Sequence, residues 1–229
     1  EKCKFDVGKY LEHLKDMRTS PSEAFVGRFI ECMLPGLKYL HEKQLFHRDL
    51  KLANILIYED ENKNWIFKIC DFGFTRPADN SDTDGSHGTP AFMAPELLQA
   101  NGKKRSSKSD VWALGCILYE CCTFKHPFDA TNQGALVLKI MRGKYEPICM
   151  DYSHDLRILV KDMLIKDMKK RLTLNKLFNR KCVIDKSKEL NMDIPFIESK
   201  GKEYLKYMKV TNDGGDGNEK KQHHKFTLN

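Results

Sequence analysis

The chain has 229 residues, of which 41% are hydrophobic and 31% charged, and its formal net charge is +7. This length suffices for one sizeable domain with a continuous core. The basic residues are scattered rather than gathered together, which argues against nucleic acid as a partner, and the longest apolar run, around residues 111–122, is too short to span a membrane.

Eight cysteines are present, and none of them forms a C-x-x-C pair, so neither a zinc site nor a thioredoxin-type motif is expected. The chain also has no N-glycosylation sequon and no signal peptide. These features indicate a reducing, intracellular setting, expected to be cytoplasmic, with the nucleus or the cytoskeleton as further possibilities. Because the chain begins with Glu1 rather than Met, we expect it to be a fragment.

A helix is predicted over residues 20–42. The run Ser-Pro-Ser-Glu that opens it is typical of a helix start, with Ser20 as the cap, Pro21 in the first turn and Glu23 completing a capping box. Pro35 removes one backbone donor and is expected to bend the helix. Apolar side chains at helical spacing predict one buried face, formed by Phe29, Met33, Leu37 and Leu40.

One short stretch contains an acid, a cation and an amide: Asp49, Lys51 and Asn54. Phosphoryl transfer needs this set: a carboxylate accepts the hydroxyl proton, a cation offsets charge on the moving phosphoryl group, and an amide oxygen binds a metal. Asp71 adds a second carboxylate, and Mg²⁺ prefers such hard oxygen ligands.

Two short strands, residues 55–57 and 65–69, separate Asp49 from Asp71. The polar segment 59–64 between them predicts a hairpin turn, whose acidic residues are interpreted as a solvated loop rather than a metal site. The hairpin carries the chain away from Asp49 and back, so that Asp71 can face the same phosphate group.

The segment 71–96 is rich in Asp, Ser, Thr and Gly and shows no periodicity. A loop of this length inside a compact domain is expected to be functional. Residues 109–120, in contrast, are apolar on almost every side, which predicts a central buried helix with Asp110 as its cap. A further helical face is predicted at residues 159–164.

The motifs H-R-D-L-x-x-x-N at 47–54, D-F-G at 71–73 and A-P-E at 94–96 occur in the order typical of one family. With them, the chain resembles the catalytic lobe of eukaryotic-type serine/threonine protein kinases over about residues 1–182. The resemblance implies an α+β, mainly α-helical fold: the C-terminal lobe of a kinase, with a short β-hairpin at the catalytic face. The run at 123–148 looks most like NIMA-related kinases, whereas the D-F-G-F turn and the hinge are nearer to the autophagy-initiating kinases.

The resemblance implies ATP and Mg²⁺ as cofactors and Ser or Thr side chains of proteins as acceptors. Asp49 is then the catalytic base, Lys51 steadies the γ-phosphate, and Asn54 and Asp71 bind the metal. Lys51, two residues after Asp49, is the feature that favours Ser or Thr over Tyr.

Residues 1–11 resemble the kinase hinge and the helix that follows it, and the backbone of Glu1 and Cys3 is expected to face adenine. No Gly-rich loop and no strand lysine precede Glu1, so the N-terminal lobe is expected to be absent from this chain. After about residue 182 the resemblance stops, and residues 183–229 are predicted to form a polar, flexible tail.

In such kinases the segment that corresponds to residues 71–96 is the activation segment. Arg48 resembles the arginine that pairs with this segment when it is phosphorylated, and Ser86 is the leading phosphosite, with an upstream kinase as a possible partner. The alternative is that Arg48 only packs and pairs locally. Acidic side chains of the segment could supply part of the negative charge without phosphorylation; they are Asp79, Asp82 and Asp84. Thr89 is instead expected to contact Asp49 and the substrate platform.

Three residues are expected to be structural. By resemblance, Glu96 pairs with Arg171, and Asp110 forms hydrogen bonds with the backbone of the catalytic loop, residues 47–54. A buried carboxylate needs such partners, and a buried pair of this kind is costly to break.

Two functions therefore remain open: a Ser/Thr protein kinase whose N-terminal lobe is missing from this chain, or a truncated, non-catalytic module that binds a partner. The presence of Asp49, Lys51, Asn54 and Asp71 together favours the enzyme, since a scaffold has no need of a metal-binding set. For the isolated chain we expect little or no activity, because nothing covers the phosphates.

Overall fold

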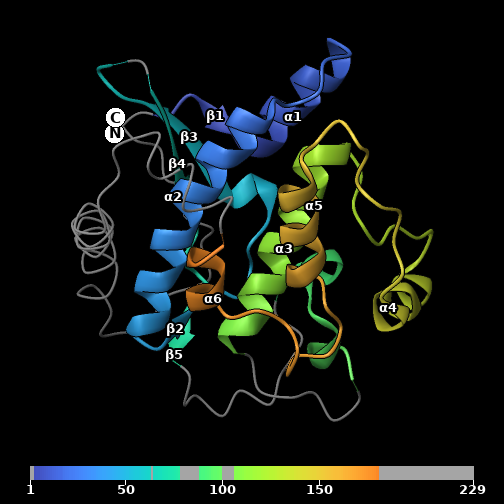
Figure 1. Ribbon diagram of the computed structural model, residues 1–229. Coiled ribbons are helices and arrows are strands. Elements are labelled where there is room, and N and C mark those ends of the chain that lie inside the picture. The colour runs from blue at the N-terminus through green and yellow to red at the C-terminus, as the bar shows by residue number, and fades with distance from the viewer. Residues whose placement is uncertain (1–2, 63, 78–87, 100–105, 181–229) are drawn as a thin grey trace, which may run out of the picture.

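The computed structural model describes residues 3–62, 64–77, 88–99 and 106–180, and within these ranges the fold is mainly helical with two small antiparallel sheets (Figure 1). The helices are α1 (Val7–Asp16), α2 (Glu23–Glu42), α3 (Ser107–Thr123), α4 (Gln133–Arg142), α5 (His154–Met163) and α6 (Leu174–Phe178). The strands are β1 (Phe5–Asp6), β2 (Leu45–Phe46), β3 (Ile55–Glu59), β4 (Trp65–Ile69) and β5 (Arg76–Pro77). Single 3-10 turns lie at Leu52–Asn54, Pro90–Phe92 and Pro95–Leu97. The predicted mainly helical fold with a small sheet is confirmed.

Helix α2 begins two residues later than its sequence suggested. Its N-cap is Ser22, whose hydroxyl accepts a hydrogen bond from the Phe25 N–H (3.1 Å). The prediction of Ser20 as the cap, with Pro21 inside the first turn, is therefore wrong. Both serines can cap a helix, so the local sequence alone does not choose between them.

Tertiary contacts with the start of α5 decide the choice. The Pro21 carbonyl accepts from the Tyr152 hydroxyl (2.8 Å), and the Glu23 carboxylate accepts from the Ser153 N–H (2.9 Å). Glu23 thus serves α5 instead of completing a capping box for its own helix.

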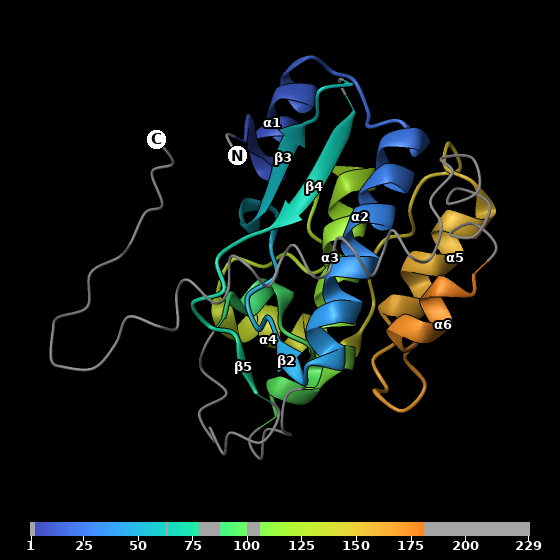
Figure 2. The ribbon, with the colours of Figure 1, turned by 90° about the vertical axis from the view of Figure 1, so that its left-hand side faces the viewer.

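The buried face predicted for α2 is confirmed. Phe29, Met33, Leu37 and Leu40 are each no more than 2% exposed, and the helix continues through Pro35. Helix α2 packs against β4, α3 and α6, so it lies between the sheet and these two helices (Figures 1 and 2).

Strands β3 and β4 form the predicted antiparallel hairpin, with Ile57 opposite Phe67 (Figure 2). The Asp60 carboxylate accepts from the backbone N–H groups of Asn62 and Asn64, which makes the acidic segment a solvated turn. The structure adds the short strand β1 beside β3, and the pairing of β2 with β5, neither of which was predicted. Two-residue strands carry no periodic signal, so only tertiary pairing defines them.

Helix α3 is the centre of the fold, and most of its side chains are buried. Ser106 is its N-cap and forms a capping box with Ser109, so the prediction of Asp110 as the cap is wrong. Asp110 lies inside the first turn, where its carboxylate is free to serve another segment. Helices α2 and α5 pack on α3 (Figure 1). None of the described helices is long and apolar enough to cross a membrane.

Candidate active site

The carboxylate of Asp49 collects polar groups from three directions. Lys51 Nζ lies 2.7 Å from Oδ2, and the amide nitrogen of Asn54 lies 3.2 Å from the same oxygen. On the other side, Thr89 donates to Oδ1 through its backbone N–H (3.0 Å) and its hydroxyl (2.9 Å). The expected contact between Thr89 and Asp49 is therefore present, although 40 positions separate the two residues.

These contacts determine the charge of Asp49. Burial alone would raise the pKa of this carboxyl, but the hydrogen bonds from Lys51 and Thr89 and the charge of Lys51 outweigh burial and hold the pKa below its usual range. Asp49 therefore stays ionised at neutral pH and can accept a hydrogen bond or a proton from an incoming hydroxyl group.

Asp71 reaches the same region from the end of the hairpin. Its backbone has a positive φ of 62°, its side chain is exposed, and its Oδ1 accepts from the Gly73 N–H (3.4 Å). The next residue, Phe72, packs edge to face on His47 with ring centroids 5.4 Å apart. The D-F-G turn is thus docked against the H-R-D turn.

His47 shows that the two carboxylates converge. Burial lowers the pKa of this imidazole, and the charges of Asp110, Asp49 and Asp71 and a hydrogen bond to the Cys70 carbonyl act in the opposite direction. The imidazole Nε2 lies 3.1 Å from the carbonyl oxygen of Cys70, the residue before Asp71, and Asp49 is two residues after His47, so the two carboxylates belong to segments that meet at this ring. That both carboxylates face one phosphate group stays a prediction.

Asp110 holds the backbone of the catalytic loop, as expected. Its carboxylate accepts from the backbone N–H groups of His47 (3.2 Å) and Arg48 (3.4 Å) and from His41 Nε2 (2.8 Å). Burial would raise the pKa of Asp110, but the contacts with His41 and His47 lower it below its usual value. Arg48 has a positive φ of 72°, a backbone conformation that such contacts support.

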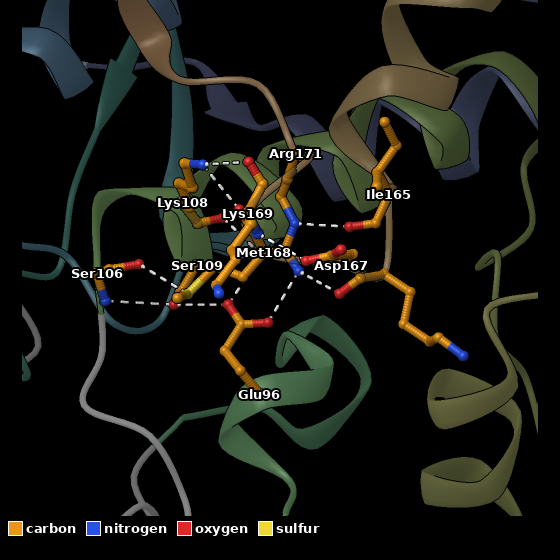
Figure 3. Close-up of polar contacts among 10 residues, drawn as sticks. Glu96, Ser106, Lys108, Ser109, Ile165, Asp167, Met168, Lys169 and Arg171 are labelled. Carbon is orange, nitrogen blue, oxygen red and sulfur yellow. Dashed lines mark hydrogen bonds and ion pairs between the residues drawn. The ribbon is translucent and has the colours of Figure 1, made fainter.

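The expected pair between Glu96 and Arg171 is present and bidentate (Figure 3). Arg171 Nη1 and Nη2 each lie 2.8 Å from one carboxylate oxygen, and the arginine side chain is fully buried. Arg171 also donates to the carbonyls of Ile165 (2.9 Å) and Lys108 (2.8 Å) and lies 4.9 Å from the Trp112 ring. The pair fixes the end of the segment 88–97, which we call the platform.

Sequence reasoning missed three partners in these networks. Ser109 donates its hydroxyl to Glu96 Oε1 (3.1 Å), and Lys108 Nζ donates to the Met168 carbonyl (2.7 Å), as Figure 3 shows. The third is His41, the partner of Asp110. Its contact spans 69 positions along the chain, so no local pattern could have indicated it.

Several predicted residues stay untested. Glu1, Ser86, the acidic residues of the segment 78–87 and the proposed tail lie outside the described residues. Cys3 is described and half-buried, next to Lys4, whose N–H donates to the Ile57 carbonyl. Its contact with adenine remains a prediction, and so does the pairing of Arg48 with a phosphate.

The donor set fits a magnesium ion shared with phosphate groups. Among the described residues, no group of three or more His, Cys, Asp or Glu side chains could hold a metal by itself. Mg²⁺ usually takes only one or two protein ligands and completes its shell with water and phosphate. The amide nitrogen of Asn54 donates to Asp49, so the amide oxygen is the atom that would bind the metal. The Cys70 N–H donates to the Asn54 backbone carbonyl (2.9 Å), which places Asn54 next to the residue that precedes Asp71.

Comparison with known proteins agrees with this geometry. A family model described as the protein kinase domain matches residues 4–183. The chain is 45% identical over 143 residues to the probable serine/threonine-protein kinase nek3 of Dictyostelium discoideum, covering 61% of this chain and 12% of that protein. It is 41% identical over 167 residues to the serine/threonine-protein kinase Nek8 of Danio rerio, covering 72% of this chain and 23% of that protein. With the probable serine/threonine-protein kinase nek2 of Dictyostelium discoideum it shares 35% identity over 193 residues, covering 82% and 45% respectively.

The chain thus spans less than half the length of these relatives. The family match nevertheless covers most of the described residues and includes every motif of the site. The chain therefore belongs to the protein kinase family and is similar in sequence to the NIMA-related kinases.

Proposed function

We propose that the protein transfers the γ-phosphoryl group of ATP to Ser or Thr hydroxyls of protein substrates. Asp49 is the base that accepts the hydroxyl proton, and Lys51 offsets the negative charge on the moving phosphoryl group. Asn54 and Asp71 would hold Mg²⁺, which would neutralise charge on the nucleotide phosphates. Protein substrates and an upstream activating kinase are the partners that this proposal includes.

One observation supports the proposal above all others: the ionised carboxylate of Asp49 is held by several polar side chains that a non-catalytic binding module would not need. Lys51 and Asn54 both contact Oδ2, while Thr89 contacts Oδ1. This leaves the carboxylate immobile, with a cation at its side. Such positioning is the main contribution that a protein makes to phosphoryl transfer.

Two features support Ser or Thr as the acceptor. Lys51 reaches both Asp49 (2.7 Å) and the Thr89 hydroxyl (3.4 Å), so it links the catalytic loop to the platform on which a peptide would lie. The relatives with matching sequences are also named as serine/threonine-protein kinases.

The test is a phosphoryl-transfer assay with Mg²⁺-ATP and three versions of one basic peptide, which carry Ser, Thr or Tyr as the acceptor. We expect weak transfer by the 229-residue chain, confined to the Ser and Thr peptides. Asp49→Asn should reduce this transfer by about 10²- to 10⁴-fold. His154→Asn, a change at an exposed residue of α5, is the control and should leave the rate unchanged.

Binding supplies a second readout that does not depend on turnover. Titration calorimetry should show that Mg²⁺ tightens the binding of ATP, and that Asp71→Asn removes this effect of Mg²⁺. A folded chain that binds no nucleotide would overturn the proposal and favour a non-catalytic binding module. Transfer that Asp49→Asn leaves intact would show that the signal comes from a contaminating kinase.

A further inference from the structure

A half-buried histidine outside the catalytic loop contacts the platform. His126 lies in the turn after α3, and its imidazole meets the Phe92 ring edge to face, with centroids 4.8 Å apart and planes at 88°. Phe92 packs against the hydrophobic core, and it lines one small cavity together with Asp49 and Thr89. The contact thus joins two segments that are distant in sequence.

Phe92 is one helical turn away from the residue that contacts the catalytic carboxylate. The Phe92 N–H donates to the Thr89 carbonyl (3.0 Å), and Thr89 in turn donates to Asp49 through both its N–H and its hydroxyl. A shift of the Phe92 ring would therefore be transmitted to Asp49 through a single 3-10 turn, Pro90–Phe92.

His126 is itself held firmly. Its Nδ1 lies 3.2 Å from the Phe128 nitrogen and 3.1 Å from the Phe128 carbonyl oxygen, so it accepts from the N–H in one tautomer and donates to the carbonyl in the other. The Phe128 ring stacks on Trp112 with centroids 5.4 Å apart. Trp112 lies under the guanidinium group of Arg171, which holds the end of the platform through Glu96. The middle of the platform, at Phe92, and its end, at Glu96, are therefore both connected to the stacked rings of Phe128 and Trp112.

Residue 126 has two separate contacts: its aromatic ring packs on Phe92, and its Nδ1 forms a hydrogen bond within the turn. Burial lowers the pKa of His126, so its imidazole is neutral at neutral pH and can accept the Phe128 N–H at Nδ1. Its Nε2 is buried and has no hydrogen-bond partner among the described residues. The hydrogen bond in the turn therefore explains only why a polar atom is present at Nδ1. It does not explain why the side chain is aromatic, and the contact with Phe92 does.

We propose that His126 is a positioning residue: its ring holds Phe92, and through Phe92 it holds the platform in the conformation that accepts a peptide substrate. This inference rests on the proposed kinase function. Its structural part, the immobilisation of the platform, is measurable without turnover.

Two substitutions separate the ring contact from the turn. His126→Phe retains an aromatic ring but loses the acceptor for the Phe128 N–H. His126→Asn retains an acceptor close to the position of Nδ1 but loses the ring, since an Asn side chain can form the same turn with its own backbone. His154→Asn serves again as the control, because this histidine is exposed.

The first readout is amide hydrogen exchange of residues 88–97 by mass spectrometry. We expect His126→Asn to accelerate exchange at Phe92 and Met93, whose N–H groups bond within the 3-10 turn, by about three- to tenfold. The segment 165–171 should be unaffected. His126→Phe should stay within about twofold of the parent chain, as an aromatic pair of similar geometry is preserved.

The second readout is the kinetics of peptide phosphorylation. His126→Asn should raise KM for the peptide by about three- to tenfold and leave KM for ATP unchanged, whereas His126→Phe should resemble the parent. In a Phe92→Leu background, His126→Asn should have no further effect.

The proposal is overturned if His126→Phe is impaired as much as His126→Asn or more, because the turn would then explain the role of the residue. It is also overturned if neither variant changes exchange at the platform. If the parent chain shows no turnover at all, the proposed function fails in this assay, and the exchange measurement still decides whether His126 holds the platform.

Discussion

The pair formed by Glu96 and Arg171 offers a sharp test of how much burial matters for an ion pair. A second pair, Lys4 with Glu59, has almost the same length, 2.7 Å against 2.8 Å. Their environments differ, however: the side chains are 0% and 4% exposed for Arg171 and Glu96, but 47% and 28% exposed for Lys4 and Glu59. The two pairs therefore differ in burial, in additional partners and in the bidentate geometry of Arg171, but hardly in length.

Arg171→Met retains much of the side-chain volume but leaves the Glu96 carboxylate buried without its cation. Removal of one partner from such a pair costs about 3–5 kcal/mol. The lost hydrogen bonds to the Ile165 and Lys108 carbonyls place the expected cost toward the upper end of that range. For a domain of this size, the change corresponds to a fall in Tm of roughly 6–20 °C.

Lys4→Met, in contrast, removes an exposed pair, for which about 0–1 kcal/mol is expected because water screens the charges. Urea denaturation followed by circular dichroism gives both free energies of unfolding by linear extrapolation. If the costs of the two substitutions differ by less than about 1 kcal/mol, the argument from burial is refuted.

Two further predictions concern the core. Gly115→Ala should destabilise the fold by about 1–3 kcal/mol, because the new Cβ would lie only 2.9 Å from Met163 Cβ. Gly36→Ala should instead stabilise α2 by roughly 0.5–1 kcal/mol, because its Cβ would lie 3.4 Å from the nearest atom. Thermal denaturation of both variants checks the sign of each change. Burial raises the pKa of Glu120 from 4.5 to about 7, so the folded chain retains a proton that the unfolded chain releases, and stability is lost as the pH rises from 4.5 through about 7. Glu120→Gln should abolish this loss, so its advantage over the parent should grow, by on the order of 2 kcal/mol, between about pH 5 and pH 8, and a constant difference would contradict the reasoning.

The sequence predicted those parts of the site whose residues lie close together along the chain. Asp49, Lys51 and Asn54 stand together because one turn contains them all, and the hairpin that returns the chain to Asp71 consists of two short apolar runs with a polar turn between them. Such local signals survive folding because each residue finds its partner nearby. The long-range contacts of Thr89 with Asp49 and of Glu96 with Arg171 were expected only from the family resemblance.

The parts that the sequence did not reveal depend on partners far along the chain. The cap of α2 fell on Ser22 rather than Ser20 because Tyr152 and Ser153 hold the residues around it. Likewise, Asp110 is not a cap, since Ser106 already fills that position and the carboxylate serves His41 and the catalytic loop. Local propensity proposes several acceptable choices in these places, and tertiary packing selects one of them.

The first turn of α3 explains why the platform and the catalytic loop keep a fixed relation. Ser109 bonds Glu96 of the platform, and the next residue, Asp110, bonds the backbone of His47 in the catalytic loop. Successive residues of a helix point about 100° apart, so one rigid turn can hold two different segments at a constant angle. Because α3 is buried on almost every side, this turn cannot tilt without disrupting the core. The distance between the platform and the carboxylate of Asp49 therefore depends on the packing of the core as well as on the loops that contain these residues.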